Sequence, residues 1–211
     1  MEAEYRNMAQ AETSPAPAHP EGEPAVIQEG LTADDYFRLP ETGVPSNLIH
    51  GRLYMSPSPF VNHQRIVLAI GHALFDYALE SGGEAFIAPM DCRLGDGNVL
   101  QPDAFYVAPE NLGIIHDHIL GSPDLVVEVL SRGTRRFDRT QKLETYARNG
   151  VREAWLVDPE SETVIVFTGD GHRWVKEQSV LFGDPIPSSI VKAGPAGLTS
   201  VSPRSEPEPT H

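Results

Sequence analysis

The stretch Ser122-Pro-Asp-Leu-Val-Val-Glu-Val-Leu-Ser131 is the most informative part of the sequence, because Leu125 to Leu130 are all apolar except Glu128. A nearly continuous apolar run of this length is typical of a central strand that is covered on both faces. An ionised carboxylate on such a strand is costly unless a positive charge lies against it. Glu128 is therefore either bridged by an arginine of the following helix, or it binds a metal ion or takes part in acid/base chemistry.

Helix and strand patterns alternate on both sides of this run. The expected elements are, in chain order, a short helix capped by Thr32 and Asp35 and ending at Leu39, a strand or hairpin arm at Asn47–Met55, a helix at His63–Leu79 closed by Gly82, strands at Glu84–Leu94 and Val99–Val107 joined by a turn at Gly95–Asn98, a loop at Pro109–Ser122, the central strand, a helix at Arg135–Asn149, a strand at Ala154–Val157, and a hairpin of Thr163–Phe167 with His172–Val175. The fold class that follows is α/β (α+β), with a mixed β-sheet flanked by helices.

Composition indicates one folded domain between two tails. We expect a disordered tail rich in acid and proline at residues 1–29, a domain at residues 30–190 and a flexible C-terminal tail at residues 191–211. No apolar run approaches the ~20 residues that span a bilayer, and the start of the chain lacks the order of a secretory signal. The single Cys92 excludes an internal disulfide and agrees with a reducing cytoplasm, and we expect its thiol to be buried. The chain is therefore expected to be a soluble cytoplasmic protein.

The charge of the chain is unevenly distributed. A net charge of −14 argues against a protein that coats nucleic acid by bulk electrostatics. Between Ser131 and Arg152, however, seven basic residues stand against two acidic ones. We expect phosphate contacts from some of the arginines at the start of the helix. These are Arg132, Arg135, Arg136 and Arg139.

Asp103 is the second candidate metal ligand. It follows Pro102 and precedes the apolar run Ala104–Val107, so it lies near a strand that can neighbour the strand of Glu128. Two carboxylates on adjacent strands suit Mg²⁺ or Mn²⁺, whereas zinc would need His or Cys at compact spacing. The alternative for Asp103 is an aspartate that caps a turn.

Lys142 is the candidate cation. It precedes the core residue Leu143 and lies four positions before Tyr146, which predicts a place at the boundary between core and solvent. A lysine there either extends over the core into solvent or stabilises the charge of a phosphate beside a metal site.

Three other polar or aromatic residues have a structural and a functional interpretation. His63 either bonds to its own backbone at the start of a helix or lies at the edge of the site. Tyr146 and Trp155 are interpreted as core residues rather than as platforms on which bases stack.

Four motifs together resemble a known family. They are Val99-Leu-Gln-Pro-Asp103, the stretch Ser122–Ser131, Asp138 with Lys142 and Tyr146, and Gly150-Val-Arg-Glu-Ala-Trp-Leu-Val-Asp158-Pro159. In this combination, and with Asn62-His63-Gln64 at the head of the long helix, the chain from Leu31 to Val175 is similar to the Uma-type restriction endonuclease family, a branch of the PD-(D/E)XK nuclease superfamily.

The resemblance implies a restriction-endonuclease-like core in which Asp103 and Glu128 are the metal-binding acids. The superfamily lysine normally lies two residues past the second acid, where this chain has Leu130. The resemblance therefore implies that Lys142 takes over its role, and that the carbonyl of Val129 is a further ligand. The implied activity is Mg²⁺-dependent hydrolysis of DNA, and because nucleases that cut both strands often pair, a homodimer is an open expectation.

One segment departs from the family pattern. The family reads Glu-Leu-Ile-Asp-Gly-Glu where this chain has Asn47-Leu-Ile-His50-Gly-Arg52. The first glutamate of the pattern is expected to point into the site, where Asn47 offers only a neutral oxygen. This departure motivates a second hypothesis, a weakened or inactive module that binds nucleic acid or protein. A third hypothesis is an unrelated structural domain in which Glu128 is only salt-bridged.

Overall fold

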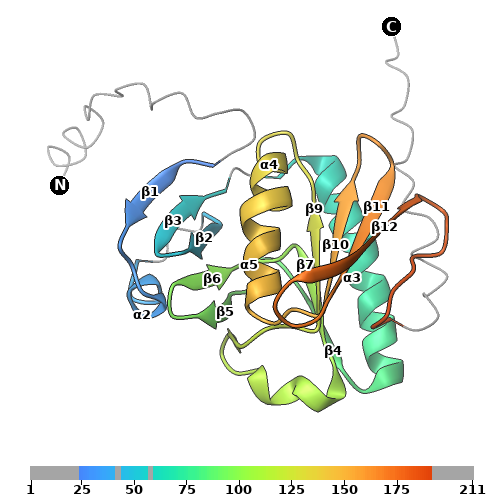
Figure 1. Cartoon of the computed structure of the whole chain (residues 1–211), viewed down its shortest axis with the longest axis horizontal. Coiled ribbons are helices and arrows are strands. Elements are labelled where there is room, and N and C mark those ends of the chain that lie inside the picture. The colour runs from blue at the N-terminus through green and yellow to red at the C-terminus, as the bar shows by residue number, and fades with distance from the viewer. Residues whose placement is uncertain (1–23, 41–43, 57–58, 192–211) are drawn as a thin grey trace, which may run out of the picture.

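Two six-stranded sheets and the helices packed against them make up the described part of the chain (Figure 1). The computed structural model describes residues 24–40, 44–56 and 59–191. In spatial order the first sheet contains β1 (Val26–Glu29), β3 (Arg52–Met55), β2 (Ser46–Ile49), β6 (Asn98–Leu100), β5 (Cys92–Gly95) and β8 (Ile119–Leu120). The second sheet contains β12 (Trp174–Leu181), β11 (Thr163–Gly169), β10 (Glu153–Asp158), β9 (Leu125–Val129), β7 (Ala104–Val107) and β4 (Glu84–Ile87). The predicted class is confirmed, but the single mixed sheet of the prediction is two sheets.

β9 is a central strand of the second sheet, as its apolar run predicts. It runs parallel to β10 and antiparallel to β7, and all five of its residues are buried. The helix α3 (Val61–Ser81) packs on one face of this sheet through Ile66, Ile70 and Leu74. The opposite face meets the first sheet and a second helix in a shared apolar core. Burial on both faces is why the run tolerates no polar residue other than Glu128.

That second helix is continuous but changes its winding. It consists of α4 (Arg135–Phe137), the π-helical segment η2 (Asp138–Lys142) and α5 (Leu143–Arg148). In Figure 1 it lies between the two sheets. Side chains from both sheets and from the helix, such as Tyr54, Phe105 and Phe137, share one core cluster. The predicted helix at Arg135–Asn149 is therefore correct to within one residue.

The two long strands that the pattern predicts at Glu84–Leu94 and Val99–Val107 are each divided between the sheets. β4 pairs with β7 in the second sheet, whereas β5 pairs with β6 in the first. Pro89 and Pro102 lie in the breaks, and proline cannot donate the amide hydrogen that a continuous ladder needs. The predicted turn is present, since Gly95 pairs with Asn98 across the β5–β6 hairpin.

The first sheet is made largely of hairpins. β2 and β3 are joined by His50 and Gly51, which both have positive φ, of 50° and 74°. This pair of left-handed residues gives the two-residue turn that matches the twist of the strands. The short helix α2 (Ala33–Tyr36) packs beside them, and Thr32 and Asp35 form the predicted capping box at its start.

Several boundaries differ from the prediction. The expected loop at residues 109–122 contains the 3₁₀-helix η1 (Pro109–Ile114) and β8. Residues 26–29, placed in the tail by composition, form β1 and pair with β3 through their backbone, which requires no apolar side chain. The remaining tail predictions, for residues 1–23 and 192–211, lie outside the described residues. Within the described ranges, no helix has the length and apolar character that crossing a membrane requires.

Candidate metal centre

The ends of β7 and β9 bring two carboxylates together. Ala104 pairs with Val127 across the antiparallel ladder, and one further step of this register sets Asp103 opposite Glu128. Residues opposite one another in antiparallel strands project from the same face of the sheet. The backbone N–H of Val129 donates to Oδ2 of Asp103 over 2.7 Å and holds this carboxylate at the end of β9. The two acids thus lie on neighbouring strands, as the sequence predicts.

One side of the α4–η2–α5 helix presents three polar groups to Glu128. Asp138, Lys142 and Tyr146 recur at every fourth position, so they lie on one helical face. Nζ of Lys142 is 2.8 Å from Oε2 of Glu128 and 3.5 Å from Oδ1 of Asp138. The hydroxyl of Tyr146 donates to Oε1 of Glu128 over 2.5 Å. Both oxygens of Glu128 therefore accept a hydrogen bond from the helix.

Lys142 does not lie at the boundary with solvent that the helical pattern predicts. It is only 6% exposed. The pattern reveals one apolar face, but the helix packs between two sheets, and the first sheet covers a second face through Tyr54, which donates to Gln141 over 3.0 Å and packs on Phe137. The lysine is thus enclosed rather than extended into solvent. The basic partner of Glu128 comes from the following helix, but it is this lysine and not an arginine.

The cluster is rich in acidic groups. Burial raises the pKa of Glu128 to about 8, the ammonium of Lys142 opposes this rise, and Asp103 and Asp138 add to it. Burial also raises the pKa of Asp138. Burial lowers the pKa of Lys142, but the charges of Glu128 and Asp138 outweigh this effect and raise it overall. Because three carboxyl groups share one ammonium, a further cation would favour their ionised forms.

His63 lies at the edge of this cluster. Its Nε2 is 3.2 Å from Oδ2 of Asp103, and its side chain is 12% exposed. Burial lowers the pKa of His63, and the hydrogen bond and charge of Asp103 outweigh burial, so that the pKa is raised. Nδ1 is buried without a hydrogen-bond partner in the described part of the chain. Of the two interpretations of His63, the structure shows the contact with the site.

The donor set suits a hard divalent cation only in part. Among the described residues, no group of three or more His, Cys, Asp or Glu side chains is placed to hold a metal ion. Mg²⁺, however, typically takes one or two carboxylates and completes its shell with water and phosphate oxygens. Asp103 meets this need, since no described residue donates to its Oδ1 and its side chain is 19% exposed. Glu128 would have to share its oxygens with Lys142 and Tyr146.

Asn47 supports the site through the backbone. It is buried, its Oδ1 accepts from the N–H of Gln101 over 3.0 Å, and its Nδ2 donates to Ser56 over 3.3 Å. Gln101 lies two residues before Asp103, so Asn47 fixes the segment that delivers this carboxylate. An acidic residue here could not donate to Ser56 as the amide does.

The arginines at the start of the helix are engaged with acids of β10 and the turn after it. Arg135 donates to both oxygens of Asp158 over 2.5 and 2.9 Å and to Glu160 over 2.8 Å. Arg132, which is largely exposed, also pairs with Glu160. For Arg132 and Arg135, contact with phosphate would require these ion pairs to open. The phosphate contacts of these two and of Arg136 therefore stay predictions.

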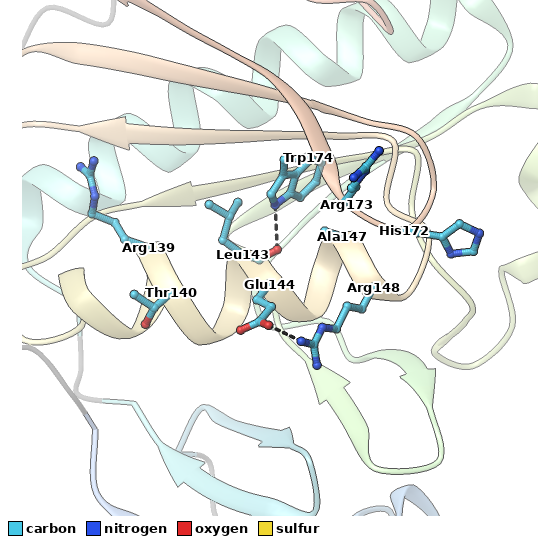
Figure 2. Close-up of a pocket in the computed structure, with 9 residues that line it drawn as sticks. All are labelled: Arg139, Thr140, Leu143, Glu144, Ala147, Arg148, His172, Arg173 and Trp174. Atoms are coloured by element: carbon cyan, nitrogen blue, oxygen red, sulfur yellow. Dashed lines mark hydrogen bonds and ion pairs between the residues drawn. The ribbon is translucent and has the colours of Figure 1, made fainter.

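Arg139 lies at a groove on another side of the helix. Figure 2 shows this groove between the helix and the β11–β12 hairpin, with Nε1 of Trp174 donating to the carbonyl of Leu143. Its volume is about 360 Å³. Arg148 and Arg173 also line it, but each pairs with a neighbouring acid, so the groove is only weakly basic. Arg139 thus faces a surface distinct from the carboxylate cluster.

Asp138 is a member of the cluster that reasoning from the residues did not single out. Its signal is its spacing of four residues before Lys142, and Thr134 holds its Oδ2 over 2.6 Å. Tyr146 and Trp155 are fully buried, which confirms their assignment to the core. The hydroxyl of Tyr146 nevertheless contacts Glu128. Cys92 is buried, as expected.

Comparison with known proteins identifies a family and a similar solved structure. The family model described as "Uma2: Putative restriction endonuclease" matches residues 33–196. The fold is similar to that of a solved "putative nuclease belonging to DUF820" from Anabaena variabilis ATCC 29413, with a TM-score of 0.64 and 22% identity over 75% of this chain and 90% of that chain. No curated protein matches the sequence.

Proposed function

Since this chain belongs to the Uma2 family of restriction-endonuclease-like proteins, we propose that it is a metal-dependent endonuclease that hydrolyses phosphodiester bonds of DNA. The observation that carries the proposal is the convergence of Asp103 and Glu128 from neighbouring strands beneath the buried ammonium of Lys142. If Glu128 only formed a structural salt bridge with Lys142, the partly exposed carboxylate of Asp103 would not be needed beside it.

Asp103 and Glu128 would hold Mg²⁺ or Mn²⁺, together with the carbonyl of Val129. When bound, the metal ion supplies an activated water and polarises the scissile phosphate. Lys142 neutralises part of the charge of the cluster and offers its remaining protons to a phosphate oxygen. His63 holds Oδ2 of Asp103, which leaves Oδ1 as the oxygen open to a cation.

The test is cleavage of plasmid DNA by purified protein with Mg²⁺, Mn²⁺ or EDTA. We expect metal-dependent cleavage by the wild type and a loss of at least about 100-fold in Asp103→Ala and Lys142→Met. Matched controls are Glu177→Ala and Lys176→Met, because both residues are exposed on β12. Cleavage that is equal in the wild type and in both site variants would refute the proposal.

A second candidate function is a binding module without catalysis. Asn47 favours it, because its amide oxygen and nitrogen are bonded to Gln101 and Ser56 and the side chain supplies no charge to a cation. Calorimetric titration with Mg²⁺ and Mn²⁺ separates the two functions. Absence of metal binding at millimolar concentration, combined with DNA binding, would favour the module.

A further inference from the structure

The outer face of α3 carries an exposed apolar stripe. Val61, Leu68, Phe75 and Leu79 are between 52% and 70% exposed, and their spacing of seven and four residues puts them on one side of the helix. Ile87 of the edge strand β4 is 46% exposed and continues this surface. We call these five residues the α3 stripe. A helix of a protein that works alone normally presents polar residues on this side.

The α3 stripe is as large as apolar patches that bind a partner. With roughly 150–250 Å² for each large side chain, its exposed fractions correspond to apolar surface on the order of 500 Å². The largest patches on monomeric proteins reach about 300–600 Å² and are often functional. A standard interface needs about 800 Å² from each partner, of which the apolar centre is a part. The stripe is large enough to be the apolar centre of such an interface.

The stripe has a recess at its centre. A hollow of about 270 Å³ lies between Leu68 and Phe75 on α3 and Ile87 on β4. Gly71 also lines it, and a Cβ at this position would lie 2.5 Å from Cγ2 of Ile87. The strand can approach the helix this closely only because residue 71 carries no side chain. A large apolar side chain from a partner can enter there.

Opposite charges flank the stripe at its two ends. Arg65 near the start of α3 and Glu80 near its end are both exposed and lie on the same margin of the stripe. Among the residues that the structure describes, neither has a salt-bridge partner. Because these opposite charges lie at the two ends of one helix face, that face is complementary in charge to an identical face that runs antiparallel to it.

We propose that a second copy of this chain covers the α3 stripe, with the two α3 helices packed antiparallel about a two-fold axis near Gly71 and His72. Residues 68 and 75 are equally far from this axis, so Phe75 of each copy lies level with Leu68 of the other and enters its hollow. Arg65 of each copy comes within one helical turn of Glu80 of the other. A parallel arrangement would instead set Arg65 level with its own equivalent and bring no Arg65 near a Glu80, which disfavours it.

This contact is independent of the proposed function. His63, which contacts Asp103, projects from the inner side of α3, away from the stripe. Covering the stripe therefore leaves the carboxylate cluster accessible. The dimer can be tested whether or not the protein cleaves DNA.

The test is sedimentation equilibrium of the full chain at about 1–100 μM in about 150 mM salt, where the repulsion between two acidic copies is screened. We expect a mass twice that of the 23.1 kDa chain. Leu68→Glu and Phe75→Glu should each weaken association on the order of 100-fold. Val175→Glu is the matched control, because Val175 is 56% exposed on β12. Far-UV circular dichroism checks that each variant is folded.

The antiparallel register has its own test. Arg65→Glu and Glu80→Arg should each weaken association about 10-fold, and the double variant should recover wild-type association within about 3-fold. Failure of this recovery would overturn the antiparallel arrangement. A wild-type monomer at 100 μM, including one whose own terminal segment covers the stripe, would overturn the dimer. So would a dimer that persists unchanged in both stripe variants.

Discussion

Replacing Lys142 with methionine should destabilise the protein strongly. Methionine keeps most of the length of the side chain but removes the ammonium that lies 2.8 Å from Glu128 and 3.5 Å from Asp138. Removal of one member of a buried ion pair typically costs about 3–5 kcal/mol, because the remaining charge has no partner. Since the pKa of Glu128 is about 8 even beside the ammonium, this carboxyl carries a proton in most molecules at pH 7, and removing the ammonium raises its pKa further, which reduces the cost. We therefore expect a loss of about 2–4 kcal/mol in the free energy of unfolding.

The assay is urea unfolding at pH 7 in EDTA, followed by far-UV circular dichroism. For a domain of this size each kcal/mol corresponds to about 2–4 °C in the melting temperature, which gives an independent check. Lys176→Met is the matched control, because Lys176 is exposed on β12, and we expect its effect to be within about 0.5 kcal/mol.

A double-mutant cycle with Glu128→Gln tests the cause. If the ammonium acts by neutralising Glu128, the cost of Lys142→Met should fall by about 1–3 kcal/mol when Glu128 is already glutamine. An additive pair of effects would refute this reasoning, as would a cost below 1 kcal/mol for Lys142→Met in the wild-type background. In either case the ion pair would not be what keeps Glu128 in the core.

Three further predictions concern the buried polar groups. In EDTA, the free energy of unfolding should fall as pH rises from about 5 to 8, because the folded pKa of Glu128 is raised to about 8 and the unfolded chain releases this proton near pH 4.5. Urea midpoints across this range measure the slope of stability against pH, and Glu128→Gln should flatten this slope. Tyr146→Phe should cost about 1–3 kcal/mol by removing the hydroxyl that donates to Oε1 of Glu128, and thermal melts that match the wild type would contradict this. Glu153→Ala should cost about 2–4 kcal/mol and speed proteolysis within residues 182–191, because this buried carboxylate accepts from Trp155, Ser188 and Ser189. An unchanged rate of cleavage by chymotrypsin after Phe182 would show that Glu153 does not anchor the segment.

The elements with regular periodicity could be predicted from the sequence. The helix α3 and its glycine stop, the capping box at Thr32 and the buried strand β9 are all where the pattern places them. Each depends on residues close together in the chain, through apolar spacing or a local cap. The division of the strands around Pro89 and Pro102 could not be predicted. A strand that leaves one sheet for another shows the same alternation as a continuous strand.

In the candidate site, too, local features could be predicted from the sequence and contacts between distant segments could not. The anomaly of Glu128 is visible in the sequence, because a charged residue in an apolar run is costly wherever the run is buried. The partners of Glu128 are not visible: Lys142 and Tyr146 are fourteen and eighteen residues away, and their contact depends on how the helix is set against β9.

By itself, the sequence determined which segments form the central strand and its flanking helices, and its resemblance to a family predicted one site with two carboxylates and a lysine. Only the tertiary structure decided that the lysine is enclosed, that Asp138 joins the cluster, and that Arg135 is held by Asp158. The physical reason is that a periodic pattern in the sequence identifies only one apolar face of a helix or strand, the face that packs on a single core. This helix packs between two sheets, so the burial and pairing of its polar groups depend on surfaces that are distant in the chain.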